Sequence, residues 1–260
     1  MSRLPRRGAL SAALSLCLAL AACGGGTNSK FSGSTLDGQV LMEASAPVSG
    51  SANVCLYAIA NGQGNPLNTA VVPPANTGTL LATGCLNTNA QGQFAQALPA
   101  FYGPVLVQIT GGSYVNRATG GSASLSALGS TNAALQAVVF VGGGGTVNVV
   151  VSPLTTIATA IALNMPGGLT MSNYAAAAAH VASEFQLGAL SITSAPGSGD
   201  AQDLALRGIE DYLVTGAAVV DDPKGSNLLS WNSAALATVS ADYTSAYNAI
   251  NGTTASFAFQ

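Results

Sequence analysis

The pattern of hydrophobic residues changes once along the chain, at Ser152, and this change sets the expected fold class. Before it, short apolar runs alternate with turn residues, which is typical of β-strands. We expect strands at 39–42, 53–59, 80–86, 93–98, 105–110, 135–141 and 147–151. After it, Ser152-Pro153 has the form of a helix cap followed by proline at the first helical position, and four helical segments follow. The pattern therefore predicts a β-sandwich domain (prealbumin/Ig-like) over 36–151 and a small all-α, four-helix domain over 152–260.

The last two predicted strands, 135–141 and 147–151, are apolar and contain no charged side chain. An exposed strand of this kind is prone to aggregation, so we expect both to be interior or covered by the helical domain. The glycine run 142–145 between them predicts a hairpin turn, because the Gly-Lys-Ser/Thr sequence of a phosphate-binding loop does not follow it.

The chain opens with the pattern of a secretory signal peptide. Three arginines within the first seven residues precede an apolar run from Ala9 to Ala22. This run of about 14 residues is shorter than the roughly 20 that a membrane-spanning helix needs. Residues 20–23, Leu-Ala-Ala-Cys, resemble the bacterial lipobox, which implies cleavage before Cys23 and a lipid such as palmitate at that residue. The signal peptide is therefore predicted at 1–22, and a flexible Gly/Ser/Thr-rich linker at 23–35.

The lipobox resemblance also implies a location. Two or more acyl chains hold a protein stably on a bilayer, whereas one chain does so only marginally. Residue 24 is Gly rather than the Asp that implies retention at the inner membrane in such lipoproteins. We expect a lipid anchor in the bacterial outer membrane, with the folded part facing either the periplasm or the cell surface.

Charge is scarce and unevenly placed. The chain has 7 Lys and Arg against 10 Asp and Glu, and loss of the predicted signal peptide would remove three of the basic residues. Between Ala44 and Ser183, Arg117 is the only Asp, Glu, Lys or Arg. Nucleic-acid binding needs clustered basic residues, so nucleic acid is excluded as a partner. Such a surface also has little electric field with which to attract a charged substrate.

The four cysteines have different expected roles. Cys17 lies in the predicted signal peptide and Cys23 is the predicted lipidation site, which leaves Cys55 and Cys85. An even pair in an exported, oxidising context predicts a disulfide bond. A two-thiol metal site is the alternative, but no His or acidic ligand lies nearby in the sequence. The sequence predicts neither a metal nor a cofactor.

Four short motifs resemble those of the bacterial prealbumin-like sandwich, of the type found as the carboxypeptidase regulatory-like domain. They are Gly38-Gln-Val40, Pro47-Val-Ser-Gly-Ser-Ala-Asn-Val54, Thr88-Asn-Ala-Gln-Gly92-Gln-Phe94 and Gly103-Pro-Val105-Leu-Val107. They follow the family's order over about 70 residues. The loop 61–79 is longer than the family's pattern, and Asn89 stands where Asp is usual. The resemblance implies a non-catalytic surface or periplasmic module and implies no particular ligand.

The predicted helices contain the residues most able to carry chemistry. His180 is the only histidine, and without a recognisable nucleophile or further ligands it is predicted to be a helix-surface or interface residue. The only acidic cluster consists of Asp200, Asp203, Glu210, Asp211, Asp221 and Asp222. Its spacing is not that of an EF-hand, so we interpret it as helix capping plus a solvated helix face, with calcium binding left open. A glycosidase pair of Glu210 and Asp211 is disfavoured, because adjacent helical residues point about 100° apart.

Three functions follow as hypotheses. The first is a lipid-anchored, non-catalytic envelope lipoprotein that acts as a binding, adhesion or scaffold module, with an envelope protein or a glycan as partner. The second is an exported hydrolase, which predicts a concave site with at least two convergent titratable groups. The third is a carbohydrate-binding module, which predicts at least two coplanar exposed aromatic rings. We expect most aromatic residues of the β domain to be in the core instead, namely Tyr57, Phe94, Phe101, Tyr102 and Tyr114.

Overall fold

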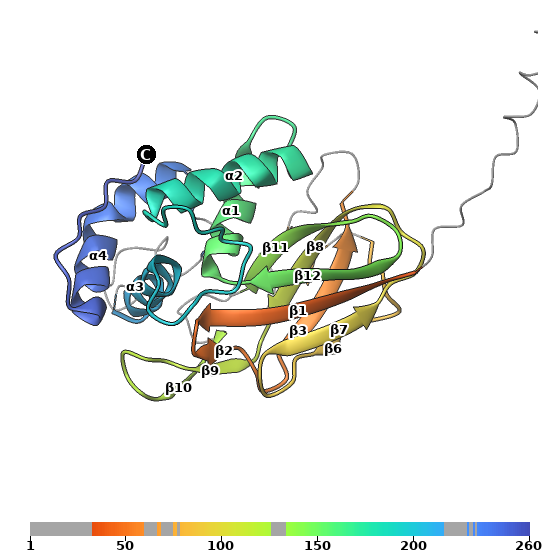
Figure 1. The fold of residues 1–260 in the computed structure, drawn as a ribbon, viewed down its shortest axis with the longest axis horizontal. Helices are drawn as coiled ribbons and strands as arrows, with labels where there is room; N and C mark the ends of the chain where they lie inside the picture. The colour runs from red at the N-terminus through yellow and green to blue at the C-terminus, as the bar shows by residue number, and fades with distance from the viewer. Residues whose placement is uncertain are drawn as a thin grey trace, which may run out of the picture. The chain divides into compact units, whose positions relative to one another are not determined.

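Two four-stranded β-sheets and four helices make up the folded part of the chain (Figure 1). The computed structural model describes residues 33–59, 67–68, 75–76, 79–125, 134–215, 228, 231 and 233–260. All of them belong to one compact unit, Phe31–Gln260. The predicted signal peptide and Cys23 therefore lie outside the described residues. In the part of the chain that is described, no helix is both long and apolar enough to span a membrane.

The first sheet, which we call the β1 sheet, is built around one long strand. Its members are β1 (Ser34–Glu43), β2 (Ala46–Pro47), β7 (Gln93–Ala97) and β12 (Gly145–Val151). β1 pairs with β12 in parallel, from Ser34 opposite Gly145 to Val40 opposite Val151. β7 and β2 pair with β1 in antiparallel fashion. The sheet thus joins the first and last strands of the β region.

The second sheet, which we call the β8 sheet, is antiparallel throughout, in the order β11-β8-β3-β6. Its members are β11 (Ala134–Val141), β8 (Gly103–Thr110), β3 (Asn53–Ala58) and β6 (Leu86–Asn87). Two short ribbons complete the β structure: β9 (Ser113–Val115) with β10 (Ser122–Ser124), and β4 (Leu67–Asn68) with β5 (Ala75–Asn76). The predicted strand 80–86 is reduced to a single bridge at Leu80 and the two residues of β6.

A glycine lets an aromatic ring pack tightly inside the β1 sheet. Gly38 lies opposite Phe94 in the β1–β7 register, and Phe94 is buried. A Cβ atom at Gly38 would lie 2.0 Å from Phe94 Cζ, so only glycine leaves room for the ring. Gly92, two residues before Phe94, has φ +70°, which favours glycine. Two of the four motifs noted in the sequence thus meet at one packing contact.

The connection between β11 and β12 corrects one prediction. The two strands belong to different sheets, so the glycine run is not a hairpin turn. Gly143, Gly144 and Gly145 all have positive φ, and the turn they form carries the chain from one sheet to the other. β12 pairs with β1 instead, and the local sequence around the turn does not indicate this pairing.

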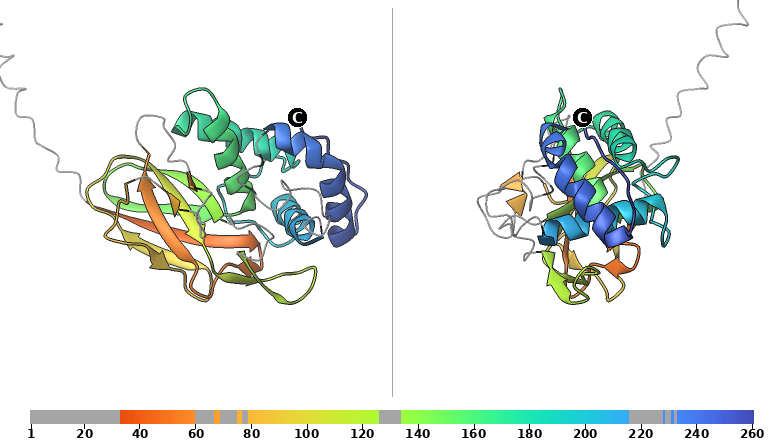
Figure 2. Two further views of the ribbon diagram at one scale, coloured as in Figure 1. Left: turned by 180° about the vertical axis from the view of Figure 1, so that it is seen from behind. Right: turned by 90° about the vertical axis from the view of Figure 1, so that its left-hand side faces the viewer.

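Helix α1 (Pro153–Asn164) follows β12 directly and covers β11 (Figures 1 and 2). Ser152 caps it in a reciprocal capping box with Thr155, with proline at the first position, as the sequence predicts. The Thr156 hydroxyl accepts a hydrogen bond of 2.8 Å from the backbone N–H of Gln136 on β11. One face of β11 is therefore covered by a helix, and its apolar side chains are mostly buried.

Three further helices complete the unit: α2 (Met171–Glu184), α3 (Ala201–Thr215) and α4 (Ser233–Asn251). Thr170 caps α2, and its hydroxyl accepts a hydrogen bond from the backbone N–H of Asn173. The side chains between α2, α3 and α4 form an aromatic cluster of Phe185, Tyr243, Tyr247, Phe257 and Phe259. The buried residues of the sheets and of the helices form one continuous hydrophobic core.

Candidate functional site

The outer face of the β1 sheet carries a groove, which we call the polar groove, of about 880 Å³. Along β1, Leu36 and Val40 are fully buried, so the intervening Asp37 and Gln39 face the opposite side. The paired strands contribute side chains at matching positions, Gln93 from β7 and Asn148 from β12. Amide side chains and one carboxylate are thus fixed on a rigid sheet.

The turn between β6 and β7 bounds one end of the polar groove. Asn89 Oδ1 accepts hydrogen bonds from the backbone N–H groups of Gln91 and Gln93, at 2.9 and 2.8 Å. Asn89 Nδ2 donates to Gln93 Oε1 over 3.2 Å. The residue that departs from the prealbumin-like pattern therefore holds the turn and orients a side chain that lines the groove.

The segment 189–195, between α2 and α3, forms the other boundary. Thr193, Ser194 and Ala195 line the polar groove. Ile192 is buried, and Gln202 Nε2 on α3 donates to the carbonyl of Ser194 over 3.0 Å. The segment is therefore fixed to α3, and the same part of it lines the polar groove.

A second hollow, which we call the apolar hollow, lies on the other side of this segment and has a volume of about 550 Å³. It is enclosed by β11, β12, α2 and the beginning of the segment, and it shares four lining residues with the polar groove. These are Asn148, Val149, Val150 and Thr193. The two hollows are therefore neighbours, one polar and one apolar, on either side of β12.

The aromatic residues of the β region are mostly in the core, as the sequence predicts. Tyr57, Phe94 and Tyr114 are buried and Phe101 is half-buried, whereas Tyr102 is 60% exposed. Phe140 on β11, which is not among these five residues, is 40% exposed and packs edge-on against Tyr102. Their ring planes are 88° apart, so this pair is not coplanar.

The acidic cluster corrects another prediction: its described members on α3 are buried rather than solvated. Asp203, Glu210 and Asp211 are at most 8% exposed. Asp203 accepts from the backbone N–H groups of Ala44 and Gly199, at 2.9 and 2.7 Å, and from the Arg207 guanidinium. Asp221 and Asp222 lie outside the described residues. These charged residues of α3 therefore contact the β region and do not form a solvent-exposed helix face.

Glu43 at the end of β1 is the centre of this contact, which we call the charged junction. Its Oε2 lies 3.3 Å from Arg117 Nη1 and 3.4 Å from Arg207 Nε. The Glu43 side chain is 2% exposed, Arg207 is 13% exposed and Arg117 is 46% exposed. The backbone N–H of Arg117 donates to Glu210 Oε1 over 3.1 Å. Residues far apart in the sequence are thus joined by ion pairs around one buried carboxylate.

Burial changes the acidity of two carboxyl groups at the charged junction. Burial raises the pKa of Glu210 to about 7. The hydrogen bond from the Arg117 N–H lowers this pKa, and the nearby Glu43 carboxylate raises it further. For Asp203, burial also acts to raise the pKa, but hydrogen bonds from Gly199 and Ala44 outweigh it, and the pKa is lowered. The pKa values of the two carboxyl groups are therefore shifted in opposite directions.

His180 lies on α2, half-buried, with Nδ1 3.8 Å from Glu184 Oε1 one turn later. Among the described residues, no group of three or more His, Cys, Asp or Glu side chains is placed to hold a metal ion. The titratable side chains that line the two hollows are Asp37 in the polar groove and Tyr174 in the apolar hollow.

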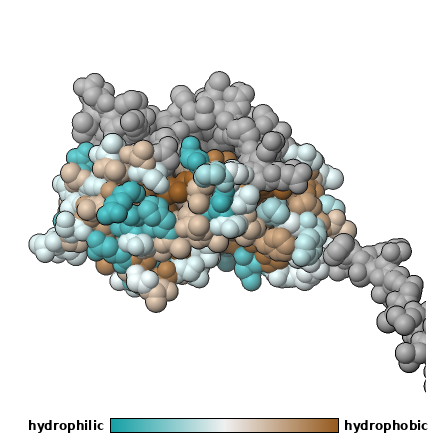
Figure 3. Space-filling view, turned by 90° about the horizontal axis from the view of Figure 1, so that it is seen from above, coloured by the Kyte–Doolittle hydropathy of each residue, from teal (hydrophilic) through white to brown (hydrophobic). Residues whose placement is uncertain are grey.

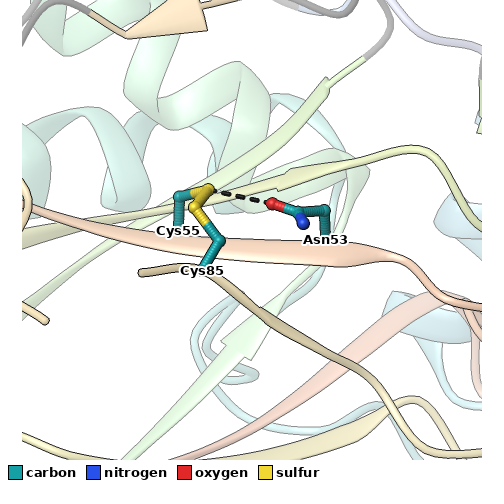
Figure 4. The surroundings of a disulfide bond; sticks show 3 residues. All are labelled: Asn53, Cys55 and Cys85. Atoms are coloured by element: carbon teal, nitrogen blue, oxygen red, sulfur yellow. Dashed lines mark hydrogen bonds between the residues drawn. A yellow bond between two sulfur atoms is a disulfide. The ribbon is translucent and has the colours of Figure 1, made fainter. Parts of the chain in front are cut away.

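The predicted disulfide between Cys55 and Cys85 is confirmed (Figure 4). It joins β3 to the residue that precedes β6, with Cα atoms 4.5 Å apart. Asn53 Oδ1 lies 3.0 Å from Cys55 Sγ, a contact without a donated proton because the sulfur is oxidised. The bond closes a segment of 30 residues.

No protein-family model matches the chain, and no curated protein does. One solved structure is similar, that of a proposed carbohydrate-binding protein from Pseudomonas aeruginosa. The similarity has a TM-score of 0.27 and 15% sequence identity, and it covers 47% of this chain and 90% of the other. At this level of similarity the comparison supports no argument about function.

Proposed function

We propose that this chain is a non-catalytic binding module and that the polar groove binds a neutral, hydroxyl-rich ligand, a glycan. The lining of the groove is the observation that carries the proposal. Its polar side chains are amides, hydroxyls and the one carboxylate of Asp37, and these groups donate and accept hydrogen bonds with sugar hydroxyls. The groove's volume is within the range of roughly 300–1,000 Å³ for ligand sites.

The β region fits a prealbumin-like sandwich in this proposal. Two four-stranded sheets and the contact between Gly38 and Phe94, which links two of the family-like motifs, support it. Tyr102 and Phe140 do not form the flat aromatic platform expected of a carbohydrate-binding module, so the glycan proposal depends on the polar groove alone.

A hydrolase is less well supported than a binding module. Asp203 and Glu210 on α3 both contact the β region at the charged junction, and none of the described carboxylates of α3 lines either hollow. General acid–base catalysis needs such groups within reach of a bound substrate. We therefore propose that the chain is not an enzyme and that its acids fix α3 to β1.

We further infer that a lipid on Cys23 anchors the module in the bacterial outer membrane, facing the periplasm or the cell surface. The motif at residues 20–23 supports this inference. The test is Cys23→Ser in cells labelled with palmitate. Loss of label and release from the membrane fraction are expected, and unchanged labelling would contradict the anchor.

Glycan binding is tested with the full-length protein on a glycan array, followed by titration of the best neutral oligosaccharide. Gln93→Ala removes a side chain that lines the polar groove, and Asp37→Asn removes its charge. Loss of one such hydrogen bond corresponds to about tenfold weaker binding. Gln91→Ala, in the adjacent turn, is the matched control because Gln91 does not line the groove. No binding of any neutral glycan, or equal binding by Gln93→Ala and Gln91→Ala, would overturn the proposal.

A further inference from the structure

The apolar hollow has the size and lining of a site for a hydrocarbon chain. One wall is α2, which contributes alanines at 175, 178, 179 and 182, and these small side chains leave space at the helix surface. The opposite wall is formed by valines of β11 and β12, together with Phe140. Its volume of about 550 Å³ is within the range of small-molecule sites.

Exposed apolar side chains gather at this hollow. Five large hydrophobic side chains are well exposed among the described residues, and two of them, Phe140 and Leu190, line the hollow. A third, Tyr102, packs against Phe140 with ring centroids 5.1 Å apart. Figure 3, which views the molecule from the side of α2, shows apolar surface among polar residues on this face. Exposed apolar surface concentrated around a concavity marks a binding site rather than chance exposure.

The hollow is continuous with the polar groove. Asn148, Val150 and Thr193 belong to the lining of both. A molecule with a polar part and an aliphatic part could therefore occupy both hollows at once, with the junction between its parts over β12. Because Asp37 is the only charged side chain in the described lining of the two hollows, an anionic headgroup is disfavoured.

We infer that the ligand is a neutral amphiphile, a glycan that carries a single linear hydrocarbon chain, and that the chain enters the hollow between α2, β11 and β12. This inference rests on the proposed function, because the polar groove would hold the sugar part. It adds a second subsite, and its test is separable from that of the first.

The test uses the full-length protein and alkyl maltosides of increasing chain length, titrated below their critical micelle concentrations with maltose as the reference. About fourfold tighter binding per added CH₂ is expected, the fold-change that corresponds to roughly 0.8 kcal/mol. Ala178→Leu fills the hollow and should abolish this dependence on chain length. Ala176→Leu, an exposed alanine on the same helix that does not line the hollow, is the matched control and should retain it.

Two results would overturn the inference. One is affinity in the wild-type protein that does not change with chain length, and the other is equal chain-length dependence in Ala178→Leu and Ala176→Leu. Laurate of matched length tests the neutral headgroup, and binding as tight as that of dodecyl maltoside would contradict it. Gln93→Ala tests the sugar subsite separately. A negative result for the hydrocarbon chain therefore does not contradict the glycan proposal.

Discussion

The polar groove and the charged junction use the chain's few strongly polar side chains in opposite ways. In the groove, uncharged amides and hydroxyls are presented on an open sheet with a single carboxylate. At the junction, Glu43, Asp203 and Arg207 are withdrawn from water and paired with one another. The chain thus uses charge to connect its own elements and leaves its candidate recognition surface almost uncharged.

Electrostatic effects on stability are therefore expected at the charged junction rather than in the sheets. Buried ion pairs are weak evidence for net stability, but removing one partner leaves an unpaired charge and costs much more. The two sheets, in contrast, are held by backbone hydrogen bonds, by packing and by one covalent bond. Substitutions at the junction should therefore depend on pH, and those in the sheets should not.

The largest effect is expected at Arg207. Arg207→Met leaves the buried carboxylates of Glu43 and Asp203 without their main cation and should destabilise the protein by about 3–5 kcal/mol. Urea denaturation measures this change. Arg117→Met is the control, because Arg117 is half-exposed and its loss should cost about 1 kcal/mol or less. Similar losses in the two variants would mean that burial does not govern the junction.

The disulfide comes next. The double substitution Cys55→Ser and Cys85→Ser releases the 30-residue segment and should lower stability by about 3–4 kcal/mol in the entropy model. The bond contains no titrating group, so the loss should be the same at pH 5 and pH 8. A loss that changes with pH would show that the sheets and the junction are not energetically separate.

Glu210 should make the junction sensitive to pH. Its pKa is about 7 in the folded protein and lower when unfolded, so the folded state binds more protons between these values. Its contribution to stability is therefore fully present below the pKa of the unfolded state and is lost progressively as the pH rises from there through about 7, by on the order of 3 kcal/mol. The charged and titratable groups around it are Arg117, Glu43, Asp211 and Tyr114.

Glu210→Gln tests this effect by removing the titration while keeping the shape. Stability measured from pH 5 to pH 8 should fall less steeply in the variant than in the wild-type protein. Asp203 has a lowered pKa, so its contribution is lost instead as the pH falls toward and below its usual range, and it does not mask the slope above pH 5. Parallel pH profiles of variant and wild type would be the contrary result.

The smallest effect is expected inside the β1 sheet. Gly38→Ala places a methyl group against the buried ring of Phe94 and should cost about 1–2 kcal/mol through overpacking. Gly84→Ala is a suitable control, because a Cβ atom there would meet no other atom within 4 Å. Equal stability of the two variants would show that the ring can move without cost.

Much of the fold could be predicted from local sequence patterns. The strand around Cys55, the strand 105–110 and the cap at Ser152 all occur close to the predicted positions. These features depend on neighbours in the sequence, namely alternation along strands and the capping residue before a helix. The disulfide could be predicted because only two cysteines remained for the folded part.

The candidate site could not be predicted in the same way. Asp37, Gln93 and Asn148 come together only through the register of β1 with β7 and β12, and the parallel pairing of β1 has no local signal. The acids on α3 are buried, not solvated as the sequence predicts, because the polar side of the helix also packs against the β region. Arg117 and Glu43, far away in the sequence, provide that contact.

The parallel pairing of β1 with β12 also constrains how the chain folds. During synthesis, which proceeds from the N-terminal end, β1 can pair first with nearby β2 and then with β7. Its other edge stays unpaired until the chain has been extended to residue 151. Closing so long a segment carries an entropic cost before the contact is made, and such topologies fold slowly. During that interval the open edge of β1 exposes unpaired backbone N–H and C=O groups, which are a template for pairing with another chain.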